Sequence, residues 1–187
     1  MAQEFPFLFL SVYRGSWDVS RKTGIRDTDA EYYKQEPCGK TPQAQGGKME
    51  YSRIGDTCVV RMDKGENIME TLKALCAKED IRLAQVDALG AVDHAEIGVF
   101  DPEQRAYCRE ELNEFLEITS LAGSVTRMDG QVYLHLHTTL AGQDHTVHGG
   151  HVIEMRVGLT CEMFVRVLPG ELTRQPDAEL GINTIRF

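Results

Sequence analysis

The sequence predicts an α+β fold, in which one main helix accompanies many antiparallel strands. Three observations indicate this class. Residues 68–79 repeat apolar side chains at helical spacing, several segments of strand length surround them, and Asp129-Gly130 separates two of these segments as a tight hairpin turn does. A single helix among strands with short connections is typical of the α+β class.

The helix comes early in the regular part of the chain. The run T-C-V-V-R-M at residues 57–62 predicts a strand, and D-K-G-E-N after it supplies a turn and a helix entry. Ile68, Leu72, Leu75 and Cys76 then share one face of the helix predicted over residues 68–79.

Strands account for most of the remaining chain. Residues 81–90 alternate apolar and polar side chains, as a half-buried strand does, and residues 95–102 form a second strand that ends at the Asp101-Pro102 turn. Further strands are expected at residues 115–127, 131–140, 146–157 and 160–168.

The first 48 residues differ in composition from the rest. Residues 34–48 are rich in Gly, Gln, Pro and Lys and have no apolar period, which is typical of a linker. We therefore expect an N-terminal extension over residues 1–48, either a disordered arm or a leader upstream of a biological start at Met49. A single domain is expected over residues 49–187.

Charge and cysteine content narrow the classes of function. The net charge is −9 and no run of Lys or Arg occurs, so the chain as a whole repels nucleic-acid phosphates. The five cysteines include no C-x-x-C pair, which excludes a zinc ribbon and favours reduced thiols in the cytoplasm. No apolar run approaches the roughly 20 residues that cross a bilayer, so no membrane partner is expected.

Five of the six histidines lie between residues 135 and 151. On a strand, His135 and His137 project to the same face, about 6.5–7 Å apart. His151 follows on the returning strand and approaches this pair, while Gly149-Gly150 admits a close backbone approach. Three neutral imidazoles from two strands would form a half-shell for zinc or iron(II), which makes His135, His137 and His151 the predicted metal ligands.

The other histidines are weaker candidates. His148 lies three residues before His151, so the two face opposite ways on a regular strand, and His148 is only a second-choice ligand. His145 belongs to a solvated turn, and His94 is isolated in the sequence. The alternative for the H-x-H pair itself is two ordinary polar residues on a strand face.

Several segments, taken in order, resemble the PPC ("plants and prokaryotes conserved") domain. They are G-E-N-I-M-E-T-L, A-L-G-A at residues 88–91, F-L-E-I-T-S-L-A-G-S, M-D-G-Q-V-Y-L-H-L-H and G-G-H-V. The resemblance runs from Tyr51 to Phe187. It implies an α+β domain with a large antiparallel sheet that assembles as a homotrimer, and a metal on the histidines that match here as His135, His137 and His151.

Two functions follow as hypotheses. In plants, PPC domains accompany AT-hook motifs in DNA-binding proteins, but no R-G-R-P core occurs in this sequence. A stand-alone prokaryotic member with a DNA-associated or regulatory role is the first hypothesis, with DNA and other copies of the chain as partners. A small-molecule enzyme that uses metal-bound water is the alternative.

Overall fold

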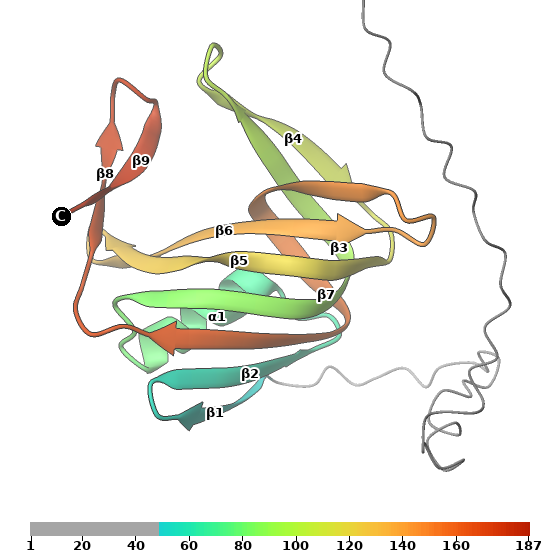
Figure 1. The fold of residues 1–187 in the computed structure, drawn as a ribbon, viewed down its shortest axis with the longest axis horizontal. Helices are drawn as coiled ribbons and strands as arrows, with labels where there is room; N and C mark the ends of the chain where they lie inside the picture. Colours follow the sequence, from blue (N-terminus) through green and yellow to red (C-terminus); the bar gives the residue numbers. More distant parts are fainter. Residues whose placement is uncertain (1–48) are drawn as a thin grey trace, which may run out of the picture. The chain divides into compact units, whose positions relative to one another are not determined.

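Nine strands and one helix make up residues 49–187, which are the residues that the computed structural model describes (Figure 1). The predicted extension over residues 1–48 lies outside the described residues. In chain order the elements are β1 Glu50–Ile54, β2 Thr57–Asp63, α1 Ile68–Lys78, β3 Ala84–Asp101, β4 Ala106–Leu112, β5 Leu116–Met128, β6 Gln131–Ala141, β7 Val147–Val167, β8 Thr173–Asp177 and β9 Ile182–Arg186.

The strands form one sheet in the order β1-β2-β7-β3-β5-β8-β9, and β4 adds to the edge of β3. Every pair is antiparallel except β5 with β8, which is parallel at Arg127 and Thr173. β6 pairs with both β5 and β7, and β3 also pairs with both. These four strands therefore close into a ring of neighbours. The predicted α+β class with a large, mostly antiparallel sheet and one helix is confirmed.

Two long strands replace four predicted short ones. β3 runs through both segments predicted at 81–90 and 95–102, and β7 joins the two predicted at 146–157 and 160–168. Shifts of register between β3 and β7 bend the strands without ending them. Gly158, which falls between the two predicted segments, allows the strands to approach closely: a Cβ there would lie 2.6 Å from the carbonyl carbon of Val92. β1, β4, β8 and β9 were not predicted.

The helix prediction is confirmed, and the helix fixes which face of β6 is buried. Asn67 caps α1 by accepting a hydrogen bond from the Glu70 amide at 3.0 Å. α1 packs against β6 and β7, behind the sheet as Figure 1 shows it. Its apolar face contributes to a core that includes the buried side chains Leu134, Leu136 and Leu140 of β6. Because side chains alternate along a strand, the residues at the odd positions among these leucines, His135 and His137 included, face away from the core.

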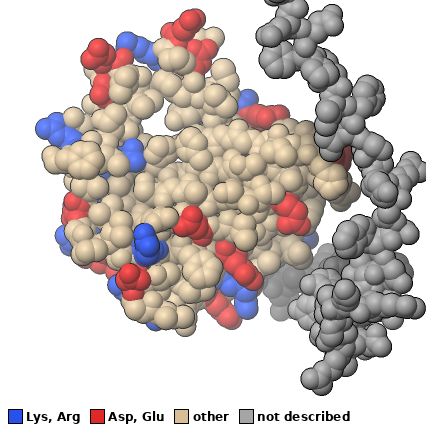
Figure 2. All heavy atoms as spheres, in the orientation of Figure 1, with Lys and Arg blue, Asp and Glu red and all other residues tan. Residues whose placement is uncertain are grey.

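Tight turns set the register of the histidine strands. Asp129 and Gly130 have φ values of 51° and 76°, as a type I′ turn requires, and the predicted β5–β6 hairpin forms there. Two further hairpins, β3–β4 and β8–β9, project from the sheet (Figure 1), and the space-filling view shows a hollow between them (Figure 2). Their ends meet where Arg105 donates hydrogen bonds to the carbonyl oxygens of Ala178 and Glu179, at 3.2 and 3.3 Å.

Candidate metal centre

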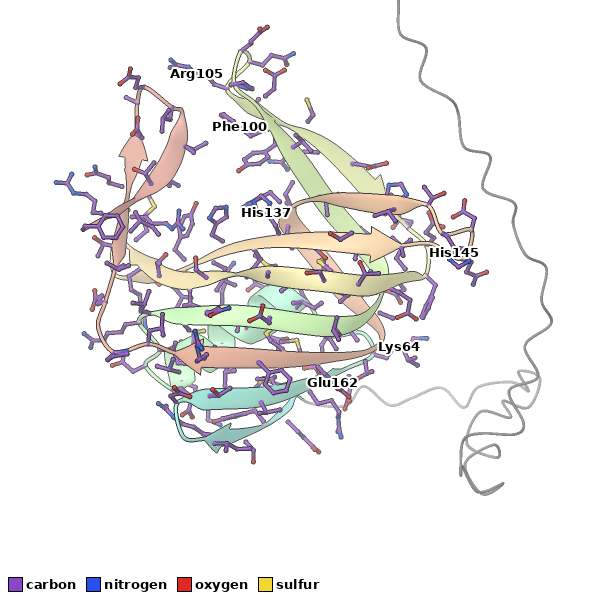
Figure 3. The ribbon with its side chains drawn as sticks, in the orientation of Figure 1. Lys64, Phe100, Arg105, His137, His145 and Glu162 are labelled. Atoms are coloured by element: carbon purple, nitrogen blue, oxygen red, sulfur yellow. The ribbon has the colours of Figure 1, made fainter. Side chains whose placement is uncertain are left out.

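The structure brings together the three histidines selected by strand parity. His137 of β6 pairs directly with His151 of β7, and His135 lies two residues before His137. One ring nitrogen from each lies within 4.8 Å of the others. Figure 3 shows His137 between β6 and the β3–β4 hairpin.

The spacing of the three rings suits a tetrahedral ion. The ring centroids are 5.2 Å apart for His135 and His137, 5.3 Å for His135 and His151, and 5.4 Å for His137 and His151. An ion bonded at about 2.0–2.1 Å to one nitrogen of each ring holds the centroids about 5 Å apart. The near-equal sides of this triangle leave room for one ion at its centre.

Local sequence explains why these side chains converge. Leu134, Leu136 and Thr138 alternate with the histidines of β6 and are buried. On β7, the Gly149-Gly150 pair admits the backbone of β3: a Cβ on Gly150 would lie 2.8 Å from the carbonyl oxygen of Gly98. The glycines thus bring β7 close to its neighbours just before His151, as expected from the sequence.

Burial keeps two of the rings neutral. Desolvation, assisted by His135, His137 and Arg174, lowers the pKa of His151 to about 4. Desolvation also lowers the pKa of His135, with smaller contributions from Arg174 and His137. A neutral imidazole has the free lone pair that metal binding needs, so the environment prepares both rings for a cation.

The ring of His151 has an unused polar atom. Its Nδ1 is buried and has no hydrogen-bond partner among residues 49–187. The ring stacks on Tyr107, with centroids 5.0 Å apart and planes at 28°, which fixes its orientation. Buried nitrogens of this kind usually have a partner, and an ion bound at Nδ1 would supply one. The donor set therefore fits a divalent metal.

A buried arginine adjoins the trio. Arg174 of β8 is 9% exposed and places a terminal nitrogen 3.2 Å from Nδ1 of His135. Its other hydrogen bonds go to the Thr126 hydroxyl at 3.1 Å and the Asn183 carbonyl at 3.0 Å. The guanidinium also lies over the ring of Tyr133, 5.0 Å from its centroid.

The remaining histidines lie apart from the cluster. His148, the reserve candidate, contacts Glu110 at 3.4 Å instead of the trio. His145 has a φ of 66° in the turn before β7, as its predicted turn position implies. His94 bonds to Asn113 at 2.8 Å. None of the three is part of the candidate centre.

Two hollows flank the trio. One, of about 310 Å³, includes His137, Ser120 and Gly150 in its lining. The other, of about 210 Å³, lies between the projecting hairpins and is called the arginine pocket below. Its lining residues are Tyr107, Tyr133, His135, His151, Arg174, Gly181, Ile182 and Asn183.

Sequence reasoning missed every member of the arginine pocket except the two histidines. Tyr107 lies on β4, Arg174 on β8 and Asn183 on β9, three strands that the pattern did not reveal. These strands are short, and β8 contains Pro176, which weakens a strand prediction. No local signal in the sequence linked them to the histidines.

The chain is similar to known proteins in sequence and in fold. A family model described as the Plants and Prokaryotes Conserved (PCC) domain matches residues 49–169. No curated protein matches the chain.

Several solved structures have the same fold. A candidate DNA-binding protein from Bacteroides thetaiotaomicron is 28% identical, with a TM-score of 0.72 over 74% of this chain and 97% of its own. A metal-containing protein from Archaeoglobus fulgidus is 35% identical, with a TM-score of 0.65 over 73% and 96%. A plant- and prokaryote-conserved (PPC) protein from Pyrococcus horikoshii is 28% identical, with a TM-score of 0.62 over 71% and 91%.

Proposed function

The chain belongs to the Plants and Prokaryotes Conserved domain family, and we propose that it is a member that binds a divalent metal through His135, His137 and His151. The observation that carries this proposal is the triangle of imidazoles with ligand nitrogens within 4.8 Å of one another. The Archaeoglobus fulgidus relative, named as metal-containing at 35% identity, supports it.

Zinc is the metal we expect, with iron(II) as the alternative. Three imidazole nitrogens suit zinc in a tetrahedral site whose fourth position stays open, and they also suit iron(II). Bound there, the ion would supply a Lewis acid beside the arginine pocket. The protein's own contribution is to keep His135 and His151 neutral and to orient the ring of His151 against Tyr107.

Metal content tests the proposal directly. We expect about one zinc per chain in the wild-type protein and less than a tenth of that in His137→Ala, whose exposed side chain can be removed without disturbing the core. His148→Ala is the matched control, because this residue lies on β7 near the site but contacts Glu110. Equal zinc in wild type and His137→Ala, measured by elemental analysis after dialysis, would contradict the proposal.

We also propose that the protein self-associates as a homotrimer, as the family resemblance implies. Leu89 and Phe164 are 60% and 52% exposed on the sheet face opposite α1, where they line a shallow hollow of about 270 Å³. Asp87 and Glu162 also line this hollow, and Figure 2 shows charged side chains scattered among uncharged ones on this face. Light scattering after size-exclusion chromatography should give the mass of three 21.0 kDa chains, and Phe164→Glu should reduce it. A wild-type monomer at micromolar concentration would contradict this proposal.

DNA association is a second candidate, favoured by the name of the Bacteroides thetaiotaomicron relative. The net charge of −9 weighs against it, since phosphate contacts supply most of the affinity of such proteins. Fluorescence anisotropy with a labelled duplex tests it: binding that weakens steeply with salt would support the candidate. No binding at low salt would exclude it.

A further inference from the structure

The arginine pocket holds a positive charge that no acidic side chain within the described residues balances. Arg174 is 9% exposed, yet no carboxylate of residues 49–187 lies within ion-pair distance of its guanidinium. No acidic residue of the described part of the chain, residues 49–187, lines this pocket. A buried charge without a counter-charge is costly, so an anion from outside the chain would be strongly favoured here.

The donors around the pocket also lack acceptors. A guanidinium has five N–H groups, and the three hydrogen bonds of Arg174 leave one N–H on each terminal nitrogen without a partner among residues 49–187. Tyr133 accepts a hydrogen bond from the Asn183 amide at 3.3 Å and retains its own O–H to donate. Tyr107 lines the same space, and burial raises its pKa, so its hydroxyl remains a donor.

We propose that the arginine pocket binds a small carboxylate, which Arg174 anchors beside the histidine trio. A planar carboxylate suits the free N–H groups of a guanidinium. The wall also includes the rings of Tyr107 and Tyr133 and the side chain of Ile182, which suit an organic body. The volume of about 210 Å³ limits the ligand to a few non-hydrogen atoms beyond its carboxylate.

The position of the pocket links the anion to the proposed metal. His135 and His151 line the pocket and also belong to the trio, so the ligand and the ion would share these two rings. The inference rests on the proposed function only in this respect, because Arg174 and the tyrosines form the anion site without the ion. A carboxylate would also offset the repulsion between Arg174 and a cation, so each should strengthen binding of the other.

Propionate is a suitable probe, and propionamide has the same shape without the charge. We expect saturable propionate binding to the metal-free full-length protein, detected by NMR shifts of the protein. Propionamide and inorganic phosphate should bind at least tenfold more weakly. Absence of saturable propionate binding, or equal binding of propionamide, would overturn the proposal. Tighter binding of phosphate would overturn the assignment of a carboxylate.

Variants test the anchor. Arg174→Met should weaken propionate binding at least tenfold, while Arg166→Met, an exposed arginine that contacts Gln85 on β3, should leave it unchanged. If Arg174→Met does not fold, Arg174→Lys keeps the charge but loses the planar fork and should weaken binding at least threefold. Unchanged affinity in a folded Arg174 variant would overturn the role of this residue.

The two proposals fail separately in this design. Propionate binding is measured on protein without metal, whereas zinc titration is measured without propionate, so neither measurement requires the other ligand. Zinc binding without propionate binding would leave the metal proposal intact and refute the anion site.

Discussion

Nδ1 of His135 accepts a hydrogen bond from Arg174, because a guanidinium can only donate. In the neutral ring the proton must then lie on Nε2, so His135 cannot use Nε2 as a metal ligand while this hydrogen bond persists. If Nδ1 were the ligand atom, the guanidinium nitrogen 3.2 Å away would compete for the same lone pair. Arg174 and a metal ion therefore oppose each other at His135.

Removing Arg174 should consequently strengthen zinc binding in buffer free of small anions. We expect Arg174→Met to lower the zinc Kd about tenfold, since it removes both the competing hydrogen bond and a nearby positive charge. Competition with a chelator measures the Kd, and Arg174→Lys, which retains the charge, should show a smaller gain. Weaker zinc binding in Arg174→Met would show instead that Arg174 positions His135 for the metal.

The metal-free protein should lose stability as the pH falls below neutral. Burial lowers the pKa of His151 to about 4, whereas in the unfolded chain it is about 6.5. Between these values the unfolded state binds more protons, so the free energy of unfolding rises with pH and is lost on acidification. We expect His151 to account for about 1–2 kcal/mol of this loss near pH 4.5, because its ring is only partly buried.

Urea unfolding in the presence of a chelator, at neutral pH and near pH 4.5, measures this effect. His151→Gln should reduce the pH dependence, since glutamine does not titrate. His94→Gln is the matched control, and it should behave as wild type. If the free energy of unfolding depends on pH equally in wild type and His151→Gln, His151 is not the source of this pH dependence.

Gly123 should be essential for the pairing of β5 with β6 beneath the histidines. A Cβ at this position would lie 2.0 Å from the carbonyl oxygen of His135 and 2.8 Å from Cα of Leu136. Gly123→Ala must therefore push β6 away, and we expect it to lower the free energy of unfolding by at least about 2 kcal/mol. Ser124→Ala, at the next position of β5, adds no atoms and should cost less than about 1 kcal/mol. Equal stability of the two variants, measured by urea unfolding, would show that β6 can shift freely.

Arg105 should hold the β8–β9 hairpin against the β3–β4 hairpin. Its two hydrogen bonds to the Ala178 and Glu179 carbonyls join the ends of the hairpins. Arg105→Ala should speed amide hydrogen exchange in β8 and β9 several-fold without changing exchange in α1. Arg109→Ala, which removes an exposed contact with Glu96 on the same hairpin, is the control. Unchanged exchange in β8 and β9 would show that Arg105 does not hold them.

The sequence alone predicted the histidine trio but not its surroundings. Strand parity was sufficient for His135, His137 and His151, because alternating side chains on β6 and one turn fix which residues share a face. Their role as metal ligands remains a prediction. Arg174 and Tyr107 reach the same space by tertiary contacts between strands far apart in the chain, and no local periodicity encodes such contacts.

Strand boundaries show the same limit. The segments around Ala91–His94 and Gly158-Leu159 interrupt the apolar pattern, so each long strand was predicted as two. In the structure, changes of register absorb these irregularities while β3 and β7 remain paired on both sides. The end of a strand and a bend in a continuous strand both interrupt the alternation of apolar and polar residues in a sequence. Only the pairing with a neighbouring strand distinguishes the two.

The match to the family model ends at residue 169, before β8 begins at Thr173. The histidines lie inside this region, whereas Arg174, Ile182 and Asn183 lie beyond it on a hairpin of its own. Tyr107 and Tyr133 of the pocket wall lie inside the matched region with the histidines, so the last hairpin contributes only one side of the pocket. Replacing the last hairpin would change this side of the proposed anion pocket without changing the three histidines. Ligand selectivity could therefore be engineered in the C-terminal hairpin.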